Sequence, residues 1–101
     1  MKYLFFLALI SSTYFLTLSC SDTTKSKEVS GKNTFLTYCI TCHGANGKLG
    51  LNGAKDLTKS VLDIDQRTSI ITNGRGGMAS YKNVLSAQEI KEVAKYTTAL
   101  K

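Results

Sequence analysis

Cys39-Ile40-Thr41-Cys42-His43 is the stretch around which the rest of the chain is organised, and it reads C-x-x-C-H. Two thiols three residues apart at the end of a helix project from one face, where they can form thioethers with the two vinyl groups of one porphyrin. The next residue then places an imidazole under the iron. The pentapeptide therefore predicts a covalently attached c-type haem with His43 as one axial ligand.

Two other chemistries use the same cysteine spacing. A tetrahedral zinc site needs four ligands, but the chain has one histidine and no second cysteine pair, which makes zinc a poor fit. A thioredoxin-like dithiol follows a strand and opens a helix, whereas Cys39 and Cys42 close a helical stretch that Gly44 ends. A thiol oxidoreductase remains an alternative, because Cys39 and Cys42 alone do not decide between it and haem.

The N-terminus has the pattern of an export signal. A short positive start, Met1-Lys2, precedes an apolar run over residues 3–18. We expect residues 1–19 to be a signal peptide and the polar residues 20–29 to be a flexible tether. The apolar run is at the short end of what spans a bilayer, so an uncleaved membrane anchor is the alternative.

The end of this signal resembles a bacterial lipoprotein box at Ser19-Cys20, although Thr17 stands where such boxes usually have an aliphatic residue. The resemblance implies that Cys20 receives lipid and anchors the exported protein to a membrane on the periplasmic side of the cell envelope. Lipidation would also account for the third cysteine, since two haem thioethers use the other two. The alternative is a plain signal peptide with Cys20 free.

The net charge of the chain indicates which classes of partner it can bind. The chain has 101 residues and a formal net charge of +6, from 13 Lys and Arg against 7 Asp and Glu. The lysines are spread through the sequence, which gives little support for binding nucleic acid. A basic face that meets acidic proteins or anionic lipid is the better interpretation.

Three helices and two glycine-rich loops are expected in the rest of the chain. Ser30 begins a helix that ends at His43-Gly44, and a compact loop follows over residues 45–56, with Leu51 and Leu57 as its apolar contacts. A second helix runs from Asp63 to Thr72, and its buried face is formed by isoleucines at positions 64, 70 and 71. Ser86-Ala87-Gln88-Glu89 is a capping box that opens the last helix.

Met78 lies at the centre of the second loop, Arg75-Gly76-Gly77-Met78-Ala79-Ser80-Tyr81. A lone methionine is ordinarily a core residue. A haem iron bound by histidine on one face has an open position opposite, and a thioether on a flexible loop is a common sixth ligand. With C-x-x-C-H upstream, Met78 is therefore predicted to be the second axial ligand.

From these motifs and their order, residues 30–101 resemble a class I cytochrome c, most closely the small bacterial monohaem proteins. The resemblance implies an all-α cytochrome c fold, with three main helices and glycine-rich loops wrapped around one covalent haem c. It implies thioethers at Cys39 and Cys42, axial ligation by His43 and Met78, and a contact of Leu57 with the ring. Phe35 and Tyr96 match the aromatic pair at which the terminal helices of the family cross.

Two positions depart from the family. Ala79 stands where a proline usually follows the ligand methionine, which leaves that loop less stiff. Lys55 replaces another proline, but the backbone carbonyl that orients the His43 ring is kept.

The function that follows from this resemblance is single-electron transfer by a monomer, with no catalysis, between respiratory redox partners such as a terminal oxidase or reductase. Lys48, Lys55, Arg75 and Lys82 would flank the exposed haem edge and steer docking onto acidic surfaces. The alternative is a haem-based sensor or enzyme domain with a labile distal ligand.

Overall fold

The computed structural model describes residues 29–101, which form a helical domain. The expected signal peptide over residues 1–19, the lipidation site Cys20 and the tether as far as residue 28 lie outside the described residues. Between residues 29 and 101 the only strand-like pairing is an isolated bridge from Arg75 to Met78, so the all-α prediction is confirmed. In chain order the elements are α1 (Gly31–Tyr38), α2 (Ile40–His43), the 3-10 turn η1 (Leu51–Gly53), α3 (Ile64–Asn73) and α4 (Ala87–Thr98). In this described part, no helix is both long and apolar enough to cross a membrane.

The predicted helix starts are confirmed by their capping bonds. The Ser30 hydroxyl accepts a hydrogen bond from the Asn33 amide at 3.3 Å, which caps α1. Asp63 with Gln66 and Ser86 with Glu89 form reciprocal capping boxes at the starts of α3 and α4. Such caps satisfy amide groups that have no partner within the helix, and each is worth roughly 1 kcal/mol.

The first predicted helix is wrong in one respect, because it is not continuous from Ser30 to His43. It breaks at Cys39, which lies between the last residue of α1 and the first residue of α2, and α2 continues as a single turn. The β-branched residues Thr37, Ile40 and Thr41 surround the break and lower the helix propensity there. The break turns the C-x-x-C-H stretch away from the axis of α1.

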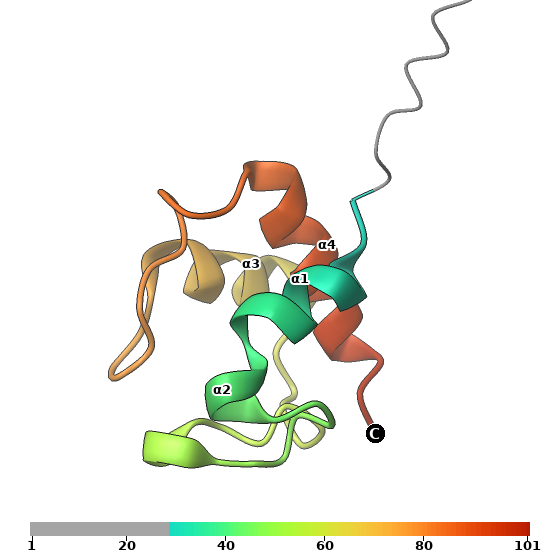
Figure 1. The fold of residues 1–101 in the computed structure, drawn as a ribbon, viewed down its shortest axis with the longest axis vertical. Helices are drawn as coiled ribbons and strands as arrows, with labels where there is room; N and C mark the ends of the chain where they lie inside the picture. Colours follow the sequence, from blue (N-terminus) through green and yellow to red (C-terminus); the bar gives the residue numbers. More distant parts are fainter. Residues whose placement is uncertain (1–28) are drawn as a thin grey trace, which may run out of the picture.

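α1 and α4 cross closely at the N-terminal end of the domain, as Figure 1 shows. The rings of Phe35 and Tyr96 lie 5.3 Å apart between centroids with an interplanar angle of 50°, so the predicted aromatic pair is present. Gly31 permits the approach, since a Cβ atom there would lie 2.6 Å from the carbonyl carbon of Glu92. Phe35 is fully buried in this crossing.

The core lies between α1, α3 and α4, and the buried polar residues beside it are Thr34, Arg67 and Thr97. Its fully or nearly fully buried hydrophobic residues are Phe35, Ile71, Leu85, Ile90, Val93 and Ala94. On α3, Arg67 is 7% exposed while Ile64 is 36% exposed, so the arginine, and not that isoleucine, occupies the inner face. The last helix ends at Thr98, which leaves Leu100 beyond it.

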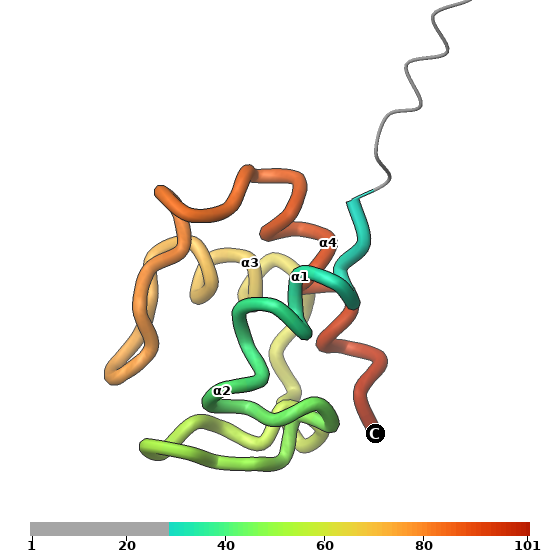
Figure 2. The backbone as a smooth tube through the Cα atoms, viewed as in Figure 1, coloured from blue at the N-terminus to red at the C-terminus, as the bar shows by residue number. Residues whose placement is uncertain are grey.

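Two loops extend from this helical frame. In Figure 2 the chain from α2 through η1 runs along the lower side of the molecule, in green to yellow. The orange segment after α3 descends on the side opposite the C-terminus. α2, which carries the histidine of the motif, lies between the helical frame and the lower loop.

Candidate haem site

Cys39 and Cys42 form no disulfide, and both are half-buried. Cys39 packs against the hydrophobic core, and this burial raises the pKa of its thiol to about 11. A dithiol oxidoreductase needs a thiol whose pKa is lowered, so the environment of Cys39 opposes that chemistry. No group of three or more His, Cys, Asp or Glu side chains among residues 29–101 is placed to hold a metal ion, which also disfavours zinc.

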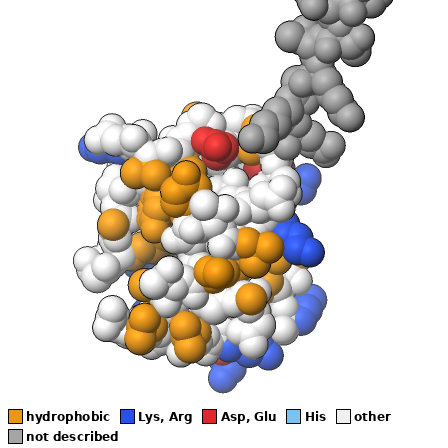
Figure 3. Space-filling view, viewed as in Figure 1, with side chains coloured by type: hydrophobic (Ala, Val, Ile, Leu, Met, Phe, Trp, Pro, Cys, Tyr) orange, Lys and Arg blue, Asp and Glu red, His pale blue; other side chains and the backbone are white. Residues whose placement is uncertain are grey.

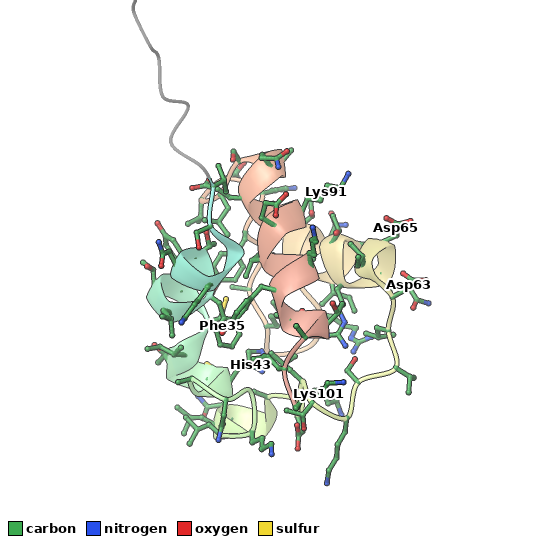
Figure 4. The ribbon with its side chains drawn as sticks, turned by 90° about the vertical axis from the view of Figure 1, so that its right-hand side faces the viewer. Phe35, His43, Asp63, Asp65, Lys91 and Lys101 are labelled. Carbon is green, nitrogen blue, oxygen red and sulfur yellow. The ribbon has the colours of Figure 1, made fainter. Side chains whose placement is uncertain are left out.

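His43 is oriented by the backbone of the loop that follows it. Its Nδ1 lies 3.0 Å from the carbonyl oxygen of Lys55. A carbonyl only accepts hydrogen bonds, so Nδ1 must donate, and Nε2 keeps the lone pair that a metal ion requires. In Figure 4 the His43 ring lies below Phe35, near the lower end of α4. The predicted carbonyl contact is therefore present despite the lysine at position 55.

Residues 43–58, which we call the His43 segment, are folded onto themselves. The Leu49 amide donates to the His43 carbonyl at 3.0 Å, and the Leu57 amide donates to the Gly47 carbonyl at 2.9 Å. The second bond brings Leu57 onto the hydrophobic core, where it is half-buried. Leu51, the other expected apolar contact, is 46% exposed in η1.

Asp56 fixes the turn at the end of this segment. Its carboxylate accepts hydrogen bonds from the hydroxyl and the amide of Thr58, at 2.6 and 2.9 Å. The hydroxyl bond is the main cause that lowers the pKa of Asp56 below its ordinary value of 3.8, and Lys59 and Lys48 lower it further. The turn directly follows Lys55, whose carbonyl holds His43.

Met78 lies in a short loop of residues 74–81, which we call the Met78 loop. Arg75 and Met78 exchange backbone hydrogen bonds of 3.1 and 3.0 Å, so the loop turns tightly at Gly76-Gly77. Gly74 has a φ of +75°, and a Cβ atom there would lie 2.6 Å from the Met78 carbonyl oxygen. Met78 itself is half-buried and packs against the core.

Residues from three separate segments thus meet at one hydrophobic core. Cys39, Leu57 and Met78 each pack against it, while the Lys55 carbonyl places the ring of His43 beside the same loop as Leu57. Figure 3 shows hydrophobic side chains gathered on the face it presents, with Lys and Arg along its right and lower edges. Thiols, an imidazole with a free Nε2, a thioether and apolar surroundings are the groups that a c-type haem uses, so the residues present fit this cofactor.

Two surface hollows lie elsewhere. One, of about 650 Å³, is bounded by residues 29–32 and by the second half of α4. The other, of about 170 Å³, lies between α3, Lys82 and the start of α4. None of the predicted haem-binding residues (Cys39, Cys42, His43, Leu57 and Met78) lines either hollow.

The sequence patterns did not indicate that the side chains of Arg67 and Tyr81 join distant segments of the chain. Arg67 is buried and donates to the Leu62 carbonyl, the Ser60 carbonyl and the Thr97 hydroxyl, at 2.9, 3.0 and 3.0 Å. Its spacing of three residues after Ile64 and four before Ile71 could have indicated an inward position. Burial lowers the pKa of this guanidinium, and its neutral partners join α3 to α4 and to the chain that follows the His43 segment.

The family of the chain is shown by comparison with known proteins. Residues 27–96 match the family described as "Cytochrome C oxidase, cbb3-type, subunit III". A "Cytochrome c6-like" protein of Nostoc sp. is 32% identical over 99 residues, which cover 90% of this chain and 88% of the relative. The chain belongs to the class I cytochromes c.

Two further proteins are similar to this cytochrome. The crystal structure of cytochrome c6C from Synechococcus sp. PCC 7002 has a TM-score of 0.59 and 29% identity, and the match covers 66% of this chain and 88% of that one. A "Cbb3-type cytochrome c oxidase subunit FixP" of Azorhizobium caulinodans is 39% identical over 85 residues. That match covers 78% of this cytochrome but only 28% of the longer FixP protein.

Membership of this family establishes the cofactor and the general activity. The cytochrome carries one covalently bound haem c and is an electron carrier for redox proteins, not an enzyme. Membership of the family thus favours haem over zinc or a catalytic dithiol as the chemistry of this chain.

Proposed function

We propose that this cytochrome transfers single electrons through a haem whose iron is bound by His43 and Met78, with thioethers at Cys39 and Cys42. The hydrogen bond between His43 Nδ1 and the Lys55 carbonyl carries the proposal, because it leaves Nε2 free to bind iron. Met78 supports it as the other ligand, since its loop meets the core that Cys39 and Leu57 also contact. The haem supplies the change between ferrous and ferric iron.

These residues would set the reduction potential of the haem iron and limit access to it. Methionine sulfur stabilises ferrous iron and raises the reduction potential, and with both axial positions filled no substrate reaches the iron. The half-buried Leu57 would pack on the ring and exclude water from it. Together they favour a carrier over a haem sensor with a labile distal ligand.

An optical spectrum of protein matured in a bacterial envelope tests the ligand set. The expected result is covalent c-type haem together with the weak red band of ferric iron bound by methionine sulfur. In the variant Met78→Ala this band should vanish, the reduction potential should fall, and the haem should remain attached through Cys39 and Cys42. A red band that persists in Met78→Ala would refute Met78 as the ligand, and haem without the band in the wild type would favour the sensor.

We further propose that the partners are acidic redox proteins of a respiratory chain, including a terminal oxidase, and that the carrier acts as a monomer. The likeness to a cbb3-type oxidase subunit supports an oxidase as acceptor. Lys48, Lys55, Arg75 and Lys82 are all exposed, and they lie in or beside the two loops that bear the ligands. Docking through them would be weak and would weaken further with salt.

The proposed location is the periplasmic side of the cell envelope, with a lipid on Cys20. The cytochrome c6 relatives and the apolar run at residues 3–18 support export. Labelling of the producing bacteria with a tagged fatty acid should mark the wild-type protein and leave Cys20→Ala unlabelled at equal haem content. The absence of label in both would indicate a plain signal peptide or an uncleaved anchor instead.

A further inference from the structure

The Met78 loop has little internal stiffness. The chain contains no proline, and Ala79 stands where the family usually has one after its ligand methionine. A side chain at Gly76 or Gly77 would meet nothing within 4 Å, so the tip of the loop lies in open space. Groups outside the tip must therefore hold the Met78 thioether in place.

Most of these outside groups belong to α3. The Tyr81 amide donates to the Ile71 carbonyl at 3.0 Å, and the Ser80 hydroxyl donates to the Thr72 carbonyl at 2.6 Å. These bonds fix the end of the Met78 loop against the helix that precedes it. They do not join the loop to the C-x-x-C-H segment, which carries the other points of haem attachment.

The side chain of Tyr81 connects the Met78 loop to the start of the C-x-x-C-H segment. Its hydroxyl donates to the backbone carbonyl of Tyr38 at 3.2 Å, and Tyr38 is the last residue of α1, directly before Cys39. Within residues 29–101 this is the only hydrogen bond between the Met78 loop and residues 38–43.

The ring of Tyr81 is held at the same place. It meets the ring of Tyr38 edge to face, with 6.3 Å between centroids and 77° between planes, and it packs against the core. Burial raises the pKa of Tyr81. Through Tyr38, the residue before Cys39, Tyr81 thus connects the start of the C-x-x-C-H segment with a loop position three residues from Met78.

We propose that Tyr81 is a positioning residue for the sixth ligand: its hydroxyl ties the Met78 loop to the end of α1 and holds the thioether on the iron. This proposal rests on the ligation by Met78 proposed above. The hydrogen bond from Tyr81 restrains the Met78 loop, as the rigid ring of a proline after the methionine would. Without it, the loop opens more often, and a competing ligand reaches the iron in proportion to the open fraction.

The test is a titration of the ferric holoprotein with imidazole, followed by loss of the red methionine–iron band. Tyr81→Phe removes the hydroxyl and keeps the ring, so the protein should fold and retain covalent haem. A neutral hydrogen bond of ordinary strength predicts about a two- to tenfold increase in imidazole affinity. Tyr38→Phe is the matched control, because it removes the neighbouring hydroxyl but leaves the carbonyl that accepts the bond; its affinity should equal that of the wild type.

A rescue variant separates positioning from stability. Ala79→Pro in the Tyr81→Phe background should bring the imidazole affinity back toward the wild-type value, because it restores stiffness next to Met78. The Ala79 amide donates no hydrogen bond within residues 29–101 that a proline would remove. A purely structural role of the hydroxyl would lower the midpoint of chemical unfolding without changing the imidazole affinity.

Three results would overturn the proposal. Unchanged imidazole affinity in Tyr81→Phe, with the red band present in the wild type, would refute the tie and leave the ligation by Met78 standing. An equal increase in Tyr38→Phe would show that the aromatic pair as a whole, and not the Tyr81 hydroxyl, controls the loop. A wild-type protein without the red band would refute the ligation and, with it, the role of Tyr81.

Discussion

The two segments that bear the proposed iron ligands are held in opposite ways. In the His43 segment the amides of His43 and Gly44 donate to the preceding turn, at Cys39 and Ile40. Beyond Gly44 the hydrogen bonds run within the segment, from Leu49 to His43, from Leu57 to Gly47 and from the His43 ring to Lys55. The Met78 loop has one internal pair, between Arg75 and Met78, and its other bonds reach α3, α1 and, through the Tyr81 carbonyl, the amides of Val84 and Leu85. Gly47 is buried within its segment, whereas Gly76 and Gly77 are exposed at a loop tip.

This difference indicates which ligand leaves the iron first. A ligand held by its own segment stays in place as long as that segment is folded. A ligand held by neighbouring helices is released when any one of those contacts opens, which costs less than unfolding the domain. The methionine side is therefore expected to control the stability of ligation, and the histidine side to keep the haem oriented while the sixth position changes.

The largest expected effect comes from a side chain at the base of the Met78 loop. In Gly74→Ala the new Cβ would lie 2.6 Å from the Met78 carbonyl oxygen and 2.9 Å from the Ser80 amide nitrogen, at a φ of +75°. Backbone atoms cannot move aside as a flexible side chain can, so the loop must shift. We expect a loss of roughly 1–3 kcal/mol in the free energy of unfolding and loss of the red methionine–iron band, measured by denaturant titration and optical spectroscopy.

Gly77→Ala is the control for this variant. Gly77 lies in the same loop, has no positive φ and would place its Cβ in open space, so the change in stability should stay within about 0.5 kcal/mol. If both variants kept the red band, the Met78 loop would tolerate displacement at its base. The contrast between a ligand held by its own segment and a ligand held by neighbouring helices would then be wrong.

The sequence predicted the parts of this cytochrome that depend on local chemistry. Capping residues Ser30, Asp63 and Ser86 start helices where their side chains can accept hydrogen bonds from backbone amides. These caps follow from neighbours within a few residues. The carbonyl at position 55, twelve residues from His43, was expected from the resemblance to the family, and it is kept despite the lysine because a backbone group does not depend on the side chain.

The features that the sequence could not show depend on contacts between residues that are far apart in the chain. The inward position of Arg67 requires Thr97, thirty residues away, together with two carbonyls that the chain presents only after it has turned. The bond from Tyr81 to Tyr38 spans 43 residues. Its acceptor is a backbone oxygen, which every residue has, so the residue types do not indicate it. The break at Cys39 was missed because the apolar period continues through it.

The smallest expected effect concerns the His43 segment at acid pH. The folded-state pKa of Asp56 is lowered, so its contribution to stability is present above its ordinary pKa of 3.8 and is lost as the pH falls through the folded value. Thr58→Val removes the hydroxyl bond but keeps the amide bond, and it should raise the pKa of Asp56 part of the way back. Unfolding midpoints measured from pH 5 down to about pH 2.5 should therefore fall less steeply in Thr58→Val than in the wild type.

A matched variant shows whether this effect belongs to the carboxylate. Thr98→Val also removes a threonine hydroxyl, but one that donates to the neutral Lys95 carbonyl, so its acid dependence should follow the wild type. Residues 74–81 contain no acidic side chain, so acid should weaken the His43 segment without acting through any group of the Met78 loop. If Thr58→Val and Thr98→Val had the same acid dependence, Asp56 would not stabilise the turn beside Lys55. The acid dependence of the unfolding midpoint would then have to come from groups other than the Asp56 carboxylate.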